Sequence, residues 1–99
     1  MIVTNKLDSV LQLLRKEFPR FQREFGVQKI GVFGSVARGE DTEDSDVDIV
    51  VEMPPRPYKL VHLKETCEEL FQTQVDIIRY RKKMNPFLKE CIDKEAVYV

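Results

Sequence analysis

Two kinds of apolar pattern alternate along this chain, and their alternation constrains its fold class. From Leu7 to Phe18, apolar residues recur at i, i+3, i+4, i+7 and i+11, which indicates one face of an amphipathic helix. Thr4 or Asn5 is placed to cap its start, Pro19 is expected to interrupt it, and Gly26 is expected to end the segment. A short apolar run over 29–33 follows, and such a run is typical of a buried strand.

The rest of the chain repeats this alternation of strands and helices. The predicted elements are, in order, a strand over 46–52, a helix with an apolar stripe from Leu60 to Phe71, a strand over 75–78, a short helix capped by Asn85 with Pro86 at its first position, and a strand over 96–99. Repeats, low-complexity tracts and linkers are not apparent. The pattern therefore predicts one α/β domain over residues 1–99.

Composition excludes several classes of protein. Apolar residues make up 42% of the 99 residues and charged residues 33%, which is a globular profile. A net charge of −1 argues against a dedicated duplex-DNA binder. No apolar run is long enough to span a membrane, and no signal peptide is visible. We therefore expect a cytoplasmic protein with reduced cysteines.

The sharpest chemical feature is a pair of carboxylates, Asp46 and Asp48, at the start of the third predicted element. Residues i and i+2 of a strand point to the same face, so the two carboxylates repel each other unless a proton or cation lies between them. Mg²⁺ commonly binds one or two carboxylates together with substrate phosphates. The alternative is a solvated acidic strand end.

A third carboxylate, Asp76, lies within the apolar run 75–78. If that strand is largely buried, the carboxylate needs a charged partner or a metal ion, because burying it unpaired is costly. The alternatives are an edge strand that exposes Asp76 to water, or an ion pair with Arg79 or Arg81.

The dipeptide Gly34-Ser35 follows directly after the strand predicted over 29–33. A glycine at a strand-to-helix turn lets backbone N–H groups approach a phosphate closely, and the serine hydroxyl can add a hydrogen bond. The alternative is a plain turn in which Ser35 caps the helix. Combined with three strand carboxylates, the dipeptide describes a two-metal phosphoryl-transfer site.

These residues resemble the signature of the DNA polymerase beta-type nucleotidyltransferases. The segments 34–39, GSVARG, and 45–48, SDVD, carry the resemblance. Ten residues separate Ser35 from Asp46, which matches the spacing in the smallest members, the minimal nucleotidyltransferases that include MntA-like antitoxins. Asp76 falls where that family has its third carboxylate.

The resemblance implies a palm-like core, with a mixed sheet and helices packed mainly on one face. It implies transfer of AMP from ATP with two Mg²⁺ ions. Gly34 and Ser35 would hold the triphosphate. Independently of the resemblance, Arg38 could reach a phosphate or pair with the acidic stretch over 40–52, which contains no Lys or Arg. Asp46 and Asp48 would bind both metals, while Asp76 would bind the catalytic metal and assist deprotonation of the attacking hydroxyl.

The resemblance also implies a partner. Many minimal nucleotidyltransferases are paired with a HEPN-domain toxin, and some adenylylate a tyrosine on it. We therefore expect another protein to present the acceptor, and the basic residues at 79–83 could contact triphosphate, that partner, or solvent alone. Two alternatives remain: a non-catalytic module that neutralises a toxin by contact, and the catalytic subunit of a transferase acting on a small molecule such as an aminoglycoside.

Overall fold

The computed structural model describes residues 5–42 and 44–99 and contains a four-stranded mixed sheet. The strand order is β3-β2-β1-β4. Strand β1 pairs antiparallel with both β2 and β4, whereas β2 and β3 run parallel. The strand bounds are Lys29–Phe33 for β1, Val47–Glu52 for β2, Val75–Arg79 for β3 and Val97–Tyr98 for β4.

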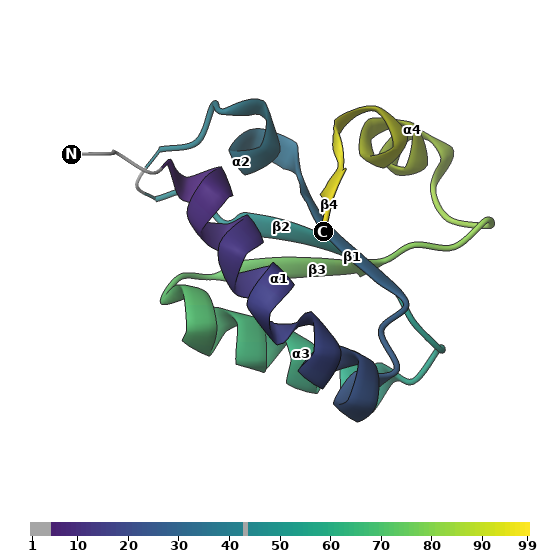
Figure 1. Cartoon of the computed structure of the whole chain (residues 1–99). Coiled ribbons are helices and arrows are strands. Elements are labelled where there is room, and N and C mark those ends of the chain that lie inside the picture. Colours follow the sequence, from purple (N-terminus) through teal and green to yellow (C-terminus); the bar gives the residue numbers. More distant parts are fainter. Residues whose placement is uncertain (1–4, 43) are drawn as a thin grey trace.

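In the described part of the chain, four helices pack against the sheet, and the two long ones contact each other (Figure 1). Their bounds are Lys6–Phe25 for α1, Gly34–Arg38 for α2, Pro57–Phe71 for α3 and Pro86–Glu95 for α4. Helix α3 is the crossover that the parallel strands β2 and β3 require. Helices α2 and α4 contact each other. They lie next to β1 and at a distance from α3 (Figure 1). The expectation of a mixed sheet covered by helices mainly on one face is confirmed.

Helix α1 continues through Pro19, so the expectation that this proline interrupts the helix was wrong. Beyond the proline, Phe21 and Phe25 are buried and their rings contact each other edge-to-face. Burial of these side chains favours continuation of the helix. Gly26 ends the helix in a left-handed conformation, as expected, and Asn5 caps its start. Thr4, the other candidate cap, lies outside the described residues.

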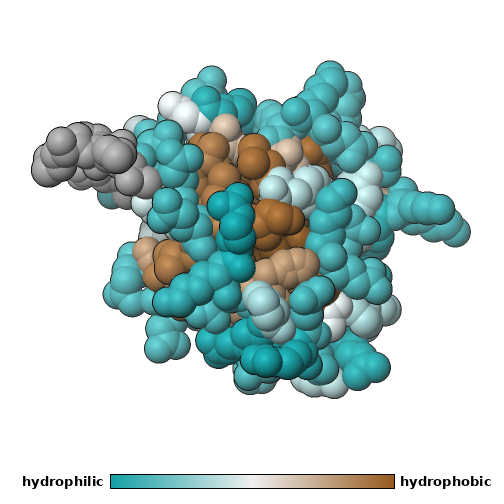
Figure 2. Space-filling model, viewed as in Figure 1, coloured by the Kyte–Doolittle hydropathy of each residue, from teal (hydrophilic) through white to brown (hydrophobic). Residues whose placement is uncertain are grey.

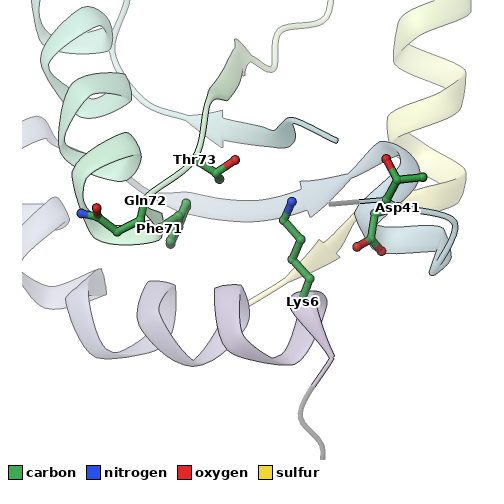
Figure 3. Close-up of a pocket in the computed structure, with 6 residues that line it drawn as sticks. Lys6, Asp41, Phe71, Gln72 and Thr73 are labelled. Atoms are coloured by element: carbon green, nitrogen blue, oxygen red, sulfur yellow. The ribbon is translucent and has the colours of Figure 1, made fainter. Parts of the chain in front are cut away.

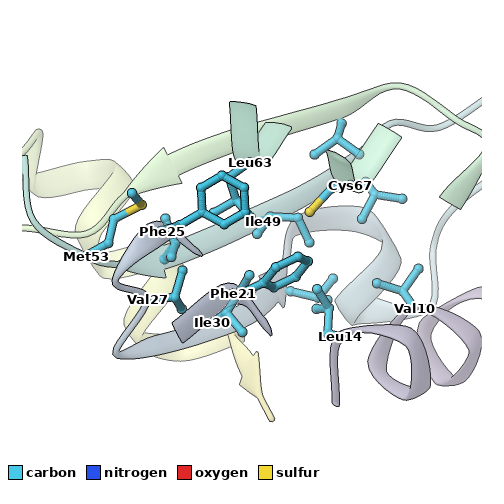
Figure 4. Close-up of a cluster of buried hydrophobic side chains, with 14 of the residues drawn as sticks. Val10, Leu14, Phe21, Phe25, Val27, Ile30, Ile49, Met53, Leu63 and Cys67 are labelled. Atoms are coloured by element: carbon cyan, nitrogen blue, oxygen red, sulfur yellow. The ribbon is translucent and has the colours of Figure 1, made fainter. Parts of the chain in front are cut away.

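The main core lies between the sheet and the pair α1 and α3 (Figure 4). Val47, Ile49 and Val51 of β2 are fully buried there, because they share one face of the strand. Leu14 and Phe21 of α1 and Leu63 and Cys67 of α3 pack against the same core. This cluster fixes the α1–α3 face of the sheet as apolar, so polar groups of β2 must lie on the opposite face.

That opposite face is covered in part by α4. A second buried cluster contains Phe33 of β1, Val50 of β2, Ile92 of α4, and Met84 from the loop before α4. Asp48 lies two residues before Val50 and therefore belongs to this face. The covered area stops short of the first residues of β2 and β3, where Asp48 is half-buried and Asp76 is exposed.

Most element bounds agree with the sequence analysis to within a few residues. Strand β2 begins at Val47, one residue later than expected, so Asp46 lies just before it. From the viewpoint of Figure 1, hydrophilic residues form most of the surface around a central hydrophobic area (Figure 2). None of the helices that the structure describes is long and apolar enough to cross a membrane.

Candidate active site

Three carboxylates lie together at one end of the sheet. Asp48 and Asp76 are paired in register across the parallel strands β2 and β3, so their side chains leave the same face of the sheet. Asp46 precedes β2 by one residue and is exposed. The charges of Asp76 and of Asp46 both act on Asp48. The structure therefore places Asp46 and Asp76 near enough to Asp48 for their charges to act on it.

The reason given for Asp76 was wrong, because this residue is exposed rather than buried. Strand β3 is at the edge of the sheet, with β2 as its neighbour on one side. Ile77 packs against the main core, while Asp76 points to the other face and to solvent. The alternative of an edge-strand aspartate is confirmed, and this location leaves Asp76 accessible to a ligand.

The pKa of Asp48 responds to its position among these charges. Burial is the largest cause that raises its pKa above the ordinary value, followed by the negative charges of Asp76 and then Asp46. The positive charge of Arg38 acts in the opposite direction, and Glu95 adds a further negative charge. A cation close to Asp48 would offset this repulsion.

Gly34 brings the main chain against Asp48. Its φ of +77° is in the left-handed region, which glycine adopts at little cost. A Cβ at this position would overlap the Asp48 carboxylate. The glycine is therefore required twice, once by its backbone conformation and once by the carboxylate that lies beside it.

Ser35 is the second residue of α2 and not its cap. The capping position belongs to Phe33, whose side chain makes no capping hydrogen bond. The alternative that Ser35 serves as an N-cap is thus wrong. The half-buried Ser35 directly follows the glycine that contacts Asp48.

Arg38 ends α2 and holds two carboxylates. Its Nε donates to Glu40 at 2.6 Å, and its Nη1 donates to Glu95 at 2.9 Å. Pairing with the acidic stretch, one of the two roles considered for Arg38, is therefore observed. Glu95 also accepts a hydrogen bond from the backbone N–H of Gly34 at 3.3 Å. Sequence analysis missed Glu95, since it is 61 residues from Gly34 along the chain.

Lys6 is a second residue that sequence analysis missed. Its Nζ donates to the backbone oxygen of Ser45 at 2.8 Å and so ties α1 to the loop that leads to Asp46. Figure 3 shows the side chain between Asp41 and the turn that joins α3 to β3. It lines an open pocket of about 510 Å³ with Asp41, Thr42, Phe71, Gln72 and Thr73.

The basic residues at 79–83 begin on the other face of the sheet. Arg79 shares its strand face with Val75 and Ile77, which contact the main core. Its Nε donates to the backbone oxygen of Met53 at 2.9 Å. With Arg81, it lines a small groove of about 170 Å³ next to Arg56 and Leu60. This placement puts Arg79 on the sheet face opposite Asp48.

The three aspartate side chains have the chemistry that a magnesium site requires. Mg²⁺ prefers oxygen ligands and takes one or two carboxylates plus substrate phosphates. Within residues 5–42 and 44–99, no group of three or more His, Cys, Asp or Glu side chains is positioned to hold a metal ion. Asp46, Asp48 and Asp76 are of the donor type that Mg²⁺ prefers, and the charges of Asp46 and Asp76 both act on Asp48.

Solved structures share this fold. A structure named as a minimal nucleotidyltransferase is 33% identical, has a TM-score of 0.69 and covers 88% of this chain and 93% of that one. A toxin–antitoxin crystal structure with AMP-PNP has a TM-score of 0.67 at 21% identity, with 96% of this chain and 72% of that chain covered. The latter similarity concerns the fold alone.

Sequence relatives agree with the structural similarity. The protein adenylyltransferase MntA of Thermococcus cleftensis is 37% identical over 101 residues, which cover 100% of this chain and 98% of the relative. MJ1379 of Methanocaldococcus jannaschii, also named as a protein adenylyltransferase, is 35% identical over 97 residues, with 94% and 97% covered. Residues 11–99 match the family described as nucleotidyltransferase domain. This chain therefore belongs to the nucleotidyltransferase domain family.

Proposed function

We propose that this chain transfers AMP from ATP to a hydroxyl group of a partner protein. The observation that carries the proposal is the grouping of Gly34, Asp48 and Asp76 at one end of the sheet, in a chain that is 37% identical over its whole length to a protein adenylyltransferase. In the reaction, the hydroxyl oxygen attacks the α-phosphorus of ATP. The bond from this phosphorus to the oxygen bridging to the β-phosphate breaks, and pyrophosphate leaves.

Gly34, Ser35 and Arg38 bind the triphosphate in this proposal. The backbone N–H of Gly34 already donates to a carboxylate, that of Glu95, and the Cα of Gly34 lies beside Asp48. A backbone donor without a side chain can approach a phosphate closely. The Ser35 hydroxyl adds a donor from the next residue. Arg38 supplies a planar fork of N–H groups, which suits phosphate oxygens.

Asp46, Asp48 and Asp76 would hold two Mg²⁺ ions, with Asp46 and Asp48 shared by both. When bound, such ions neutralise phosphate charge and stabilise the attacking and leaving oxygens. The edge position of β3 leaves Asp76 exposed and so open to a second substrate. It accepts the proton of the attacking hydroxyl.

A HEPN-type toxin encoded nearby is the proposed partner, with a tyrosine as the modified residue and this chain as the antitoxin. The support is the fold that the chain shares with the antitoxin complexes named MntA–HepT and the name MntA of its relative. Such a partner places the reaction in the cytoplasm. The basic groove next to Arg79 lies on the sheet face opposite Asp48, where it can contact the partner without blocking the carboxylates.

Mass spectrometry of the partner tests the proposal. The protein is incubated with ATP, Mg²⁺ and the product of the adjacent gene, and we expect the partner to gain the mass of AMP. Fragmentation then locates the modified side chain. A partner that gains no AMP while the two proteins bind each other would favour the alternative of neutralisation by contact.

A double variant, Asp46→Asn with Asp48→Asn, is the matched control. Both substitutions preserve side-chain volume and remove negative charge, so the fold is expected to persist. We expect no AMP transfer from this variant. Full transfer by a correctly folded double variant would contradict the assignment of these aspartates.

A further inference from the structure

The Glu95 carboxylate accepts hydrogen bonds from two groups that we assign to triphosphate binding, the Gly34 N–H and Arg38. Glu95 is the last residue of α4, and its side chain is 22% exposed. One oxygen accepts from the Gly34 backbone N–H at 3.3 Å, and the other accepts from Arg38 Nη1 at 2.9 Å. The two bonds connect the end of α4 to both ends of the five-residue helix α2.

Both donors are therefore already hydrogen-bonded to a negatively charged side chain of the protein, Glu95. A carboxylate, like a phosphate, accepts charge-assisted hydrogen bonds through two oxygens. A phosphate oxygen and a Glu95 oxygen cannot both take the same N–H in good geometry. The negative charge of Glu95 also acts on Asp48, so it adds repulsion at the place where ATP brings further negative charge.

We propose that Glu95 is an internal competitor of the triphosphate and that it sets the affinity of this site for nucleotide. In the nucleotide-free protein, its carboxylate satisfies Gly34 and Arg38. Nucleotide binding requires that it release both. This inference rests on the proposed function, since it takes Gly34 and Arg38 as phosphate donors.

Release of Glu95 needs no rearrangement of the fold. A glutamate side chain can rotate about its own bonds, and the main chain of this region is fixed separately. The Ala96 N–H donates to Ile92 at 2.9 Å, and β4 pairs with β1 directly afterwards. Arg38 would retain its contact with Glu40. The exchange is therefore local, with one carboxylate leaving two donors and a phosphate taking them.

Calorimetric titration of Glu95→Gln with AMP-PNP and Mg²⁺ tests this idea without relying on activity. The substitution keeps the length of the side chain and removes its charge. We expect binding at least about 10-fold tighter than in the wild type, equivalent to about 1.4 kcal/mol. Inorganic tripolyphosphate with Mg²⁺ should show the same gain, because the competition concerns phosphate. Adenosine should show none.

Glu90→Gln is the matched control on the same helix. Glu90 is exposed and pairs with Lys94 at 2.8 Å, so its loss should leave nucleotide affinity unchanged. Glu95→Ala is the second variant and must change affinity in the same direction as Glu95→Gln. Thermal unfolding of each variant checks that it folds.

The outcomes separate this inference from the function on which it rests. Unchanged or weaker binding by folded Glu95→Gln would overturn it and make Glu95 a residue that positions Arg38, while the proposed function would stand. A gain for adenosine equal to that for tripolyphosphate would also overturn it. If neither the wild type nor the variants bind AMP-PNP or tripolyphosphate, the proposed nucleotide site itself fails.

Discussion

Asp48 and Asp76 are direct neighbours across the parallel pair of strands β2 and β3, and both side chains leave the sheet face opposite the main core. Their proximity results from strand pairing and not from sequence separation. The α3 crossover returns the chain so that each strand begins at the same end of the sheet. The two like charges at that end repel each other, and this relationship supports the first two predictions.

Asp48→Asn is expected to lower AMP transfer by at least about 100-fold, because even outer-shell partners of a metal cost 10- to 100-fold when removed. Steady-state assays of partner modification at saturating Mg²⁺ would measure the effect. Asp44→Asn is the matched control, since Asp44 is exposed in the same acidic stretch but lies outside the strand pair. Equal losses in the two variants would indicate a general charge effect instead of a site at Asp48.

The same variant is expected to be more stable than the wild type at pH 7 when metal is removed with a chelator. The pKa of Asp48 is raised in the folded protein, mainly by burial and then by Asp76. A raised carboxyl pKa means that ionisation destabilises the folded state as pH rises above the unfolded value of 3.8. The gain should therefore disappear near pH 3, where both states are protonated. Melting temperatures at the two pH values would show it, and a gain of equal size at pH 3 would contradict this origin.

Gly34→Ala is expected to cost more stability than Gly39→Ala, although the two glycines have similar positive φ values of 77° and 73°. The left-handed backbone costs a non-glycine residue about 1–2 kcal/mol at either position. At Gly34 the new methyl group also overlaps the Asp48 carboxylate, whereas nothing lies within 4 Å of the equivalent point at Gly39. Urea denaturation would separate the two contributions. Equal losses would mean that Asp48 moves away freely.

The sequence predicts the elements of this fold well because their signals are local. The apolar stripe that begins at Leu7, the cap at Asn85 and the strand over 29–33 all occur as expected. The continuation of α1 through Pro19 was not predictable in this way, since it depends on burial of Phe21 and Phe25 against distant residues.

The sequence predicted those parts of the candidate site whose residues lie close together along the chain. Asp46, Asp48 and Gly34-Ser35 follow from spacing and from the family resemblance. The exposure of Asp76 depends on strand order, because the edge position of β3 is a property of the whole sheet. Glu95 reaches Gly34 from 61 residues away, and its isolated position in the sequence carries no signal of that contact.

The two cysteines are expected to differ in reactivity. Cys67 is buried in the main core, and burial raises the pKa of its thiol to about 12. The thiolate is the reactive form, so Cys67 remains protonated and unreactive at pH 8. Cys91 is partly exposed. Iodoacetamide should therefore label Cys91 in the native protein and Cys67 only after unfolding, as followed by peptide mass spectrometry. Simultaneous labelling of both would contradict the packing of α3.

Ser35→Ala is expected to weaken the use of ATP while leaving the carboxylates and the fold intact. Ser35 lies inside α2 and does not cap it, because Phe33 holds that position, so its hydroxyl is not needed to begin the helix. A hydrogen bond to a charged group is worth roughly 1.5–3 kcal/mol. At about 1.4 kcal/mol per factor of ten, its loss lowers kcat/KM about 10- to 140-fold.

Ser9→Ala is the matched control for this experiment, since Ser9 is exposed on α1. Initial rates measured at a series of ATP concentrations for the wild type and both variants would give kcat/KM for each. Metal binding by Ser35→Ala should match the wild type, because the hydroxyl is assigned to phosphate and not to the ions. If kcat/KM were unchanged, the Ser35 hydroxyl would have no part in binding the triphosphate, and the donors at this turn would reduce to the main chain and Arg38.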